Sequence, residues 1–104
     1  MHVFEVLGDS VRRRLLELLA DGERTSGDLT SVIRAEVGIS QPAVSQHLRV
    51  LREHGLARVR PEGTRRLYAV DRRGLREVEH WLERFREPYR QDEEIPPVQG
   101  RPTG

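Results

Sequence analysis

Apolar residues recur at helical spacing in the first part of the chain, separated by short polar breaks. Residues 2–7 carry three of them, at Val3, Phe4 and Leu7. Asp9 then suits the N-cap of a second helix and Gly22 suits its end, with an inward stripe formed by Val11, Leu15, Leu18 and Leu19. The pattern predicts a short helix over 2–7 and a longer one over 9–22.

Two further helices are expected on either side of a turn of a few residues around Gly38. Thr25 suits the N-cap of the first, and its inward residues are Leu29, Val32 and Ile33. Ser40 suits the N-cap of the second, Pro42 fits its first turn and Gly55 its end, and its inward residues are Val44, Leu48 and Leu51. Two helices joined by so short a turn predict a helix-turn-helix.

After Gly55 the apolar period changes. Residues 56–60 and 65–70 read as two short strands around a turn at 61–64, which contains Pro and Gly. A last helix is predicted to begin at Asp71 and to end or bend at Pro88, and residues 89–104 read as a disordered tail. The fold class is therefore mainly α with a small β-hairpin (α+β): a winged helix-turn-helix domain over 1–88, in the order α-α-α-α-β-β-α.

The fourth predicted helix has a polar side opposite its apolar stripe. This side holds Gln41, Pro42, Ser45, Gln46, Arg49 and Arg52, with the N-cap Ser40 at its start and His47 on the flank. Gln can pair with adenine and Arg with guanine or a phosphate, so the face suits a DNA major groove. A plain solvated helix face is the alternative, and His47 is open between a phosphate contact and a partly buried structural residue.

The predicted hairpin carries four arginines, Arg58, Arg60, Arg65 and Arg66. The formal net charge of the whole chain is only +1, but residues 40–66 contain six Arg against two Glu. A cationic hairpin beside a polar helix face favours DNA binding, because it can follow phosphates or enter a minor groove. Arg12, Arg13 and Arg14 are open between a phosphate contact and ion pairs within the protein.

Three segments carry a resemblance to a known family: "LGDSVRRRLLELLADGERTSGDL", "SQPAVSQHLRVLREHGLARVRPEGTRRLYAV" and the closing amphipathic helix. Together, over residues 3–87, they resemble the ArsR/SmtB family of bacterial transcriptional repressors. The resemblance implies that the second helix of the motif and the hairpin, or wing, bind operator DNA. It also implies that the terminal helices form a homodimer.

Apolar residues of the two terminal helices are the candidate dimer interface: Val3, Phe4, Leu7, Leu75, Val78, Trp81, Leu82 and Phe85. The alternative is that the last helix packs only onto its own domain. Two recognition helices related by a two-fold axis would read an inverted repeat.

Members of the family often release DNA when they bind a metal, and two site types are implied by the resemblance. Neither is present as written: Thr25 and Gly27 stand at the cysteine positions, and the last helix begins Asp71-Arg72-Arg73 in place of Asp-x-His. The remaining candidate ligands are His2, Glu77, His80 and Glu83, which would suit Ni(II), Zn(II) or Co(II). A solvated helix face with one His is the alternative.

The composition and the absence of certain motifs narrow the kinds of protein to which this sequence can belong. There is no cysteine, no secretory signal and no apolar run near the ~20 residues of a membrane span, so we expect a cytoplasmic protein. No catalytic triad pattern or phosphate-binding glycine loop is present, which argues against an enzyme. A winged helix that acts with a regulatory partner protein is the competing function.

Overall fold

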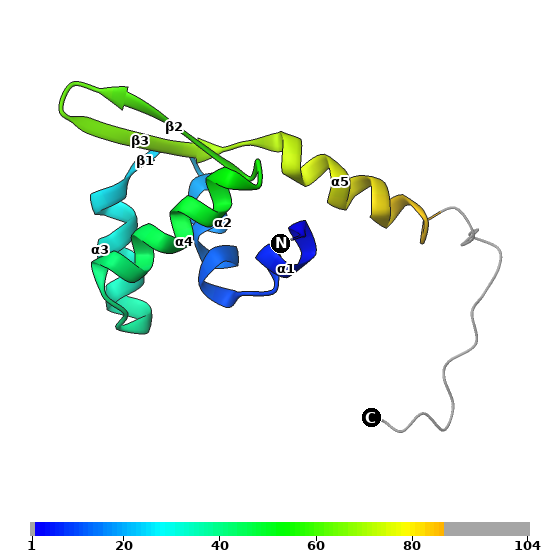
Figure 1. Cartoon of the computed structure of the whole chain (residues 1–104), viewed down its shortest axis with the longest axis horizontal. Helices are drawn as coiled ribbons and strands as arrows, with labels where there is room; N and C mark the ends of the chain where they lie inside the picture. The colour runs from blue at the N-terminus through cyan, green and yellow to red at the C-terminus, as the bar shows by residue number, and fades with distance from the viewer. Residues whose placement is uncertain (1, 87–104) are drawn as a thin grey trace.

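The computed structural model describes residues 2–86; the predicted tail at 89–104 and the predicted helix end at Pro88 lie outside them. The elements follow one another as α1 (Val3–Leu7), α2 (Ser10–Ala20), β1 (Arg24–Thr25), α3 (Ser26–Val37), α4 (Gln41–Glu53), β2 (Ala57–Glu62), β3 (Arg65–Val70) and α5 (Arg72–Glu83). This is the predicted winged helix-turn-helix, with one strand added between α2 and α3 (Figure 1).

Each of the four longer helices begins at the predicted cap, where a side-chain oxygen accepts a backbone N–H. Asp9 accepts from Val11 and Arg12, and Thr25 accepts from Asp28. Ser40 and Asp71 cap α4 and α5 in the same way. The α3 helix ends at Gly38, whose φ of 83° lies in the left-handed region.

The core lies where α2, α3 and α4 pack against one another and against the inner face of the sheet. Its fully buried large side chains include Leu15, Leu29, Ile33, Leu48, Leu51 and Leu56. Most come from the predicted stripes, while Val11 and Val32 are only partly buried against this core. The two helices of the helix-turn-helix are therefore held by a common apolar centre.

The sheet has three strands in the order β1-β3-β2, all antiparallel. The two-residue β1 pairs with the middle of β3, Arg24 opposite Tyr68, and was not predicted. The turn of the hairpin is also shorter than the predicted 61–64, because Pro61 and Glu62 continue β2 opposite Arg66 and Arg65. Only Gly63 and Thr64 form the turn, and Gly63 adopts a positive φ of 64°.

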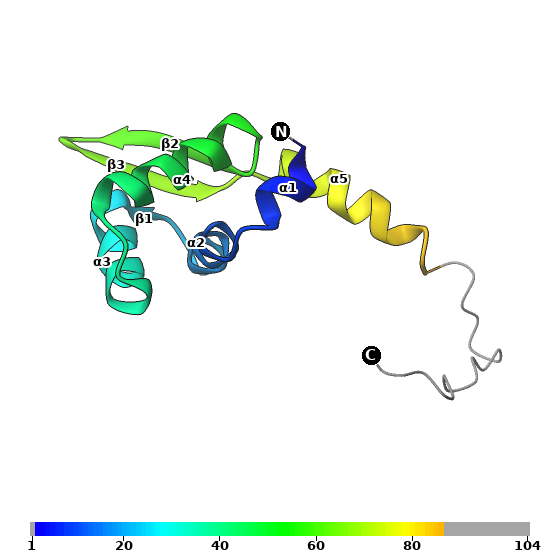
Figure 2. The same ribbon diagram turned by 60° about the horizontal axis from the view of Figure 1, so that its bottom comes forward.

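Helix α5 leaves the domain and extends away from the core, with α1 beside its first turns (Figures 1 and 2). None of the residues of α5 is buried, although Leu75 and Val78 pack partly against the core. The helix ends at Glu83 with Arg84 as its C-cap, earlier than the predicted end at Pro88. In its last turn, Trp81 has an aromatic neighbour from α1, namely Phe4.

Candidate nucleic-acid interface

Helix α4 presents its polar side to solvent as predicted. Val44, Leu48 and Leu51 are buried, and the exposed side chains are Gln41, Pro42, Ser45, Gln46 and Arg49. The hydroxyl of Ser40 is engaged in the structure, since it accepts the backbone N–H of Ala43 at 3.3 Å. The side chains of Gln41 and Ser45 remain available for hydrogen bonds to a base edge or phosphate.

Gln46 and Arg49 act as a pair on this face. One guanidinium nitrogen of Arg49 donates to the side-chain oxygen of Gln46, one helical turn earlier. The bond restricts the rotamers of both side chains and leaves the amide nitrogen of Gln46 without a part in it. The pair is thus partly ordered before any ligand arrives.

His47 lies at the edge of the α4–α2 contact. Its Nδ1 is 3.3 Å from a guanidinium nitrogen of Arg12 and 3.9 Å from a carboxylate oxygen of Asp9, and its side chain is only 21% exposed. Burial raises the pKa of Asp9, but the N–H groups of Arg12 and Val11 and the charge of His47 outweigh it, so the net shift is downward. Of the two alternatives for His47, this geometry fits the structural one.

The three arginines at the start of α2 also bind within the protein. Arg12 and Arg13 donate to the carbonyls of Val6 and Leu7, each at 2.8 Å, and so cap the end of α1. Arg14 forms a bidentate pair with Glu36 on α3, at 2.9 and 2.8 Å. Their positions therefore fit the ion-pair and capping alternative.

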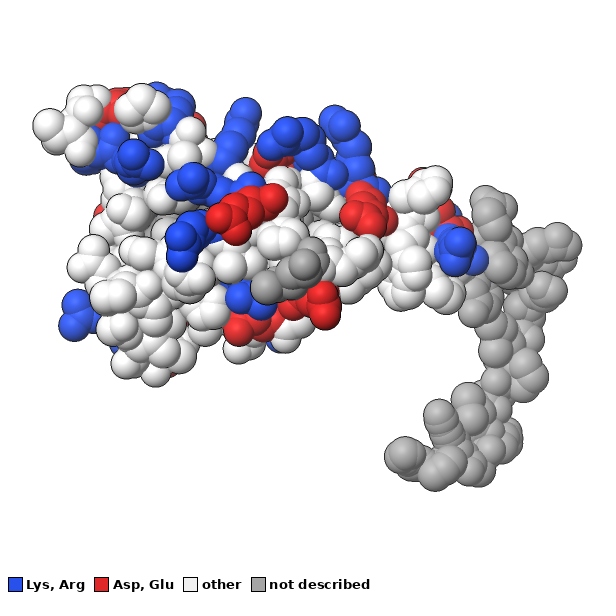
Figure 3. Space-filling view, in the orientation of Figure 1, with Lys and Arg blue, Asp and Glu red and all other residues white. Residues whose placement is uncertain are grey.

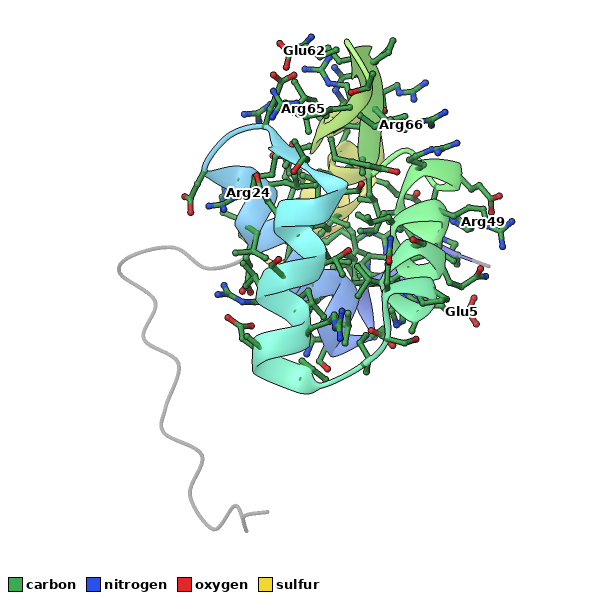
Figure 4. The ribbon with its side chains drawn as sticks, turned by 90° about the vertical axis from the view of Figure 1, so that its left-hand side faces the viewer. Glu5, Arg24, Arg49, Glu62, Arg65 and Arg66 are labelled. Carbon is green, nitrogen blue, oxygen red and sulfur yellow. The ribbon has the colours of Figure 1, made fainter. Side chains whose placement is uncertain are left out.

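The four wing arginines lie on two different faces of the hairpin. Arg58, Arg60 and Arg65 share the outer face, because their cross-strand partners are Ala69, Leu67 and Glu62. Arg66 is on the inner face, the one that carries buried Tyr68. Figure 4 shows Arg66 and Arg49 on the same side of the molecule, with Arg65 and Glu62 toward the opposite side.

Two of these arginines have carboxylate partners. Arg60 donates to both oxygens of Glu23 at 2.9 Å, and this hydrogen bonding lowers the pKa of Glu23. Arg65 is 3.1 Å from Glu62 across the turn. Between residues 2 and 86, Arg66 has no such partner, so its charge is not neutralised at the wing tip.

A recess of about 410 Å³ lies between the wing tip and the start of α3. It is lined by Thr25, Ser26, Gly27, Thr64, Arg65 and Arg66. Arginine side chains and the positive end of a 12-residue helix both favour an anion there. Basic side chains also gather over the hairpin and α4 in the face shown in Figure 3.

The candidate dimer residues divide into two groups. Val3 is buried in the core of its own chain, and Leu7, Leu75 and Val78 pack partly against that core. The outer group is exposed: Phe4 is 38%, Trp81 42%, Leu82 50% and Phe85 48% accessible. Three of its members form a row of edge-to-face ring contacts, with ring centroids 5.1 Å apart for Phe4 and Trp81 and 4.8 Å for Trp81 and Phe85. Phe4, Trp81 and Phe85 are called the aromatic cluster below.

The predicted four-residue metal set does not come together. His2 Nε2 lies 3.1 Å from Glu77 of the same chain, while its Nδ1 accepts the N–H of Phe4 as the cap of α1. His80 and Glu83 are exposed, and residues 2–86 contain no group of three or more candidate metal ligands. Within one chain the four residues therefore form no common site, and both ring nitrogens of His2 have partners within that chain.

Comparison with known proteins decides the family. The family model for bacterial regulatory proteins of the arsR family matches residues 9–59. The HTH-type transcriptional regulator Rv2034 of Mycobacterium tuberculosis is 42% identical over 82 residues, which cover 79% of this chain and 73% of that protein. The chain belongs to the ArsR family. The family resemblance inferred from the motifs is confirmed.

Two further ArsR-family comparisons agree with this assignment. The transcriptional repressor SdpR of Bacillus subtilis is 29% identical over 84 residues, 81% of this chain and 89% of that protein. A crystal structure described as a possible transcriptional regulator for arsenical resistance superposes with a TM-score of 0.70 at 39% identity, covering 82% of this chain and 84% of the other. Its fold confirms the winged helix.

The ArsR assignment gives the general function. The chain is a DNA-binding transcription regulator with a winged helix-turn-helix, and its family is one of regulators, not of enzymes. In the described part of the chain, no helix combines the length and apolarity needed to cross a membrane.

Proposed function

We propose that this ArsR-family chain is a homodimeric repressor that binds an inverted-repeat operator through α4 and the tip of the wing. The observation that carries the proposal is the shared side of Arg66 and the exposed face of α4 around Arg49 (Figure 4). Gln41, Ser45 and Gln46 would contact base edges, since the first turns of a recognition helix enter the major groove.

The wing would bind the phosphate backbone. Arg66 brings an unneutralised charge to the tip, and the recess between the tip and α3 offers Arg65 and a helix N-terminus to a phosphate oxygen. Arg58 and Arg60 lie further from the tip on the outer face, and Arg60 is held by Glu23. We therefore assign the main phosphate contact of the wing to Arg66, with Arg65, which pairs with Glu62, as a second contact at the recess.

The aromatic cluster supports the dimer. Four large apolar side chains of α1, α5 and the turn after α5 are 38–50% exposed in a single chain, and Phe4, Trp81 and Phe85 form a continuous row. A second copy of α5 laid against this row would remove it from water and contribute the usual free energy of apolar burial. Two-fold symmetry would then separate the two α4 helices by about one turn of DNA, ~34 Å.

Repression follows from occlusion of a promoter by such a dimer, and SdpR is a relative that is named a repressor. The proposal assigns no metal effector, because His2 uses one ring nitrogen for Glu77 and the other for the α1 backbone.

Footprinting of the DNA upstream of the gene tests this proposal. We expect one protected region that contains an inverted repeat with half-sites about one helical turn apart. Transcription from that promoter in vitro should fall when the protein is added. Protection of a single half-site, or of no defined region, contradicts the proposed homodimeric repressor.

A further inference from the structure

We propose that the cavity between α2, the end of β3 and the first turn of α5 binds a small organic anion with an apolar body, and that this ligand weakens DNA binding. The second half of the inference rests on the proposed repressor function. The first half, binding of the anion, stands on the cavity alone.

Most of the residues that line the cavity are apolar. It measures about 460 Å³, within the range of about 300–1,000 Å³ typical of sites for small molecules. Its apolar lining residues are Leu16, Leu19, Ala20, Ala69, Val70 and Leu75. Such a lining accepts the aliphatic or aromatic part of a ligand, because its burial removes apolar surface from water.

Two guanidinium groups line the same cavity, Arg58 from β2 and Arg72 from α5. Within residues 2–86 neither of them forms a hydrogen bond or an ion pair with a side chain, whereas the neighbouring arginines do. Glu23 also lines the cavity, but Arg60 holds both of its carboxylate oxygens. The buried carboxylate of Asp71 is likewise held by Arg73.

These contacts select the charge of the occupant. The carboxylates near the cavity already have cationic partners, so Arg58 and Arg72 leave an excess of positive charge in its lining. A planar guanidinium recognises a carboxylate through two parallel hydrogen bonds. An apolar carboxylate therefore matches both the apolar residues and the two guanidinium groups of the lining. A neutral or cationic molecule of the same shape leaves the guanidinium groups without an anionic partner.

The position of the cavity connects it to the DNA-binding elements. Its walls are the base of the wing and the start of α5, and the backbone N–H of Asp71 donates to the carbonyl of Leu56 at 2.9 Å just beside it. A bound anion neutralises positive charge at the base of the wing and pushes on the first turn of α5. Both effects lower affinity for a polyanion, and by linkage DNA lowers affinity for the ligand by the same factor.

Calorimetry with 1-naphthoate tests the site, with 1-naphthylmethanol as the neutral probe of matched shape. We expect naphthoate to bind at least about tenfold more tightly than the alcohol, and Arg58→Gln or Arg72→Gln to remove about tenfold of that affinity. Arg76→Gln is the matched control, an exposed arginine of α5 that does not line the cavity. Ala69→Leu should abolish binding of both probes by filling the cavity.

Each result decides a separate claim. Equal binding of the two probes, no binding of naphthoate, or an equal loss with Arg76→Gln overturns the anion site. Naphthoate should also weaken DNA binding of the wild type at least about threefold and leave Ala69→Leu unaffected; an unchanged DNA affinity overturns the regulatory half. Because the calorimetry contains no DNA, failure of the protein to bind any operator would refute the repressor proposal without altering the ligand result.

Discussion

The backbone N–H of Gly74 donates a hydrogen bond of 2.7 Å to the carbonyl of Gly55, which joins the first turn of α5 to the turn that follows α4. The two backbones approach so closely that a Cβ on Gly74 would lie 2.8 Å from the carbonyl oxygens of Gly55 and His54. The proposed dimer helix is thus in direct backbone contact with the turn that ends the recognition helix. A shift of one requires an adjustment of the other.

Gly74→Ala tests this contact. Because the clashing atoms are backbone oxygens, they cannot rotate away, and we expect a loss of about 1–3 kcal/mol in the free energy of unfolding. DNA affinity should also fall, since α5 and α4 can no longer keep their spacing. Urea denaturation and fluorescence anisotropy measure the two effects.

Gly27→Ala is the control, because its Cβ would meet only the hydroxyl oxygen of Thr25 at 3.8 Å. It should leave the stability unchanged or slightly raised. A Gly74→Ala protein as stable as the wild type would show that the α4–α5 contact is not tight.

Asp71 gives a prediction on pH. Hydrogen bonds from the side chain and backbone of Arg73 lower its pKa below the ordinary value of 3.8. The charged form is favoured in the folded state, so its contribution is fully present above pH 3.8 and is lost as the pH falls through the lowered pKa.

Asp71→Asn keeps an oxygen that can accept the N–H of Arg73 but removes the charge, while Asp71→Ala also removes the cap. At pH 6 we expect the free energy of unfolding to fall by about 1–2 kcal/mol in the Ala variant and by less in the Asn variant. The difference in the free energy of unfolding between wild type and Asp71→Asn should close as the pH drops below 3.8. A gap that is independent of pH from 6 to 3 would contradict the assignment.

The helix-turn-helix could be predicted from the sequence because its signals are local. Caps such as Asp9, Thr25, Ser40 and Asp71 act within their own first turn, and the buried stripes follow from the helical period. The exposed polar side of α4 follows from the same period. The predicted helices therefore agree with the structure in their order and, for the four longer ones, in their N-caps.

The remaining features depend on contacts between segments that are far apart in the sequence, so a local sequence pattern does not predict them. Strand β1 is two residues long and exists only because β3 lies opposite it, so no period within the sequence marks it. The turn residues Pro61 and Glu62 are compatible with a strand edge as well as with a loop. The division of the wing arginines between two faces depends on the register of β2 and β3, and the partners of His47 and Arg60 come from distant segments.

The aromatic cluster gives a prediction on assembly. Trp81→Glu places a charge in the centre of the proposed interface, and we expect a monomer at micromolar concentration by sedimentation velocity, with DNA affinity lowered at least about tenfold. Glu79→Lys is the control, a charge change at an exposed residue of the same helix. The dimer interface is placed wrongly if the Trp81→Glu protein sediments as the wild type does.

Gln46 and Arg49 should behave as one unit in DNA recognition. Gln46→Ala and Arg49→Ala are each expected to reduce discrimination between operator and mutated operator by about 1–3 kcal/mol. The double variant should lose less than the sum of the two, because each single change already breaks their hydrogen bond. Strictly additive losses in a double-mutant cycle would mean that the pair contacts DNA independently.

Arg66→Ala should have a different signature. As a phosphate contact, Arg66 contributes to all duplexes alike, so we expect weaker binding to operator and scrambled DNA by the same factor and a salt slope reduced by about 1. Arg34→Ala, which removes an exposed charge from α3, is the control. A loss confined to the operator would assign Arg66 to base recognition instead.

Fluorescence anisotropy on the footprinted operator and a scrambled duplex of equal length, titrated at several salt concentrations, tests the central claim most directly. We predict operator binding at least about 10³-fold tighter than scrambled binding, with both affinities falling steeply as salt rises. Equal affinity for the two duplexes, or binding that is indifferent to salt, would contradict a sequence-specific repressor and favour a winged helix that acts through a partner protein.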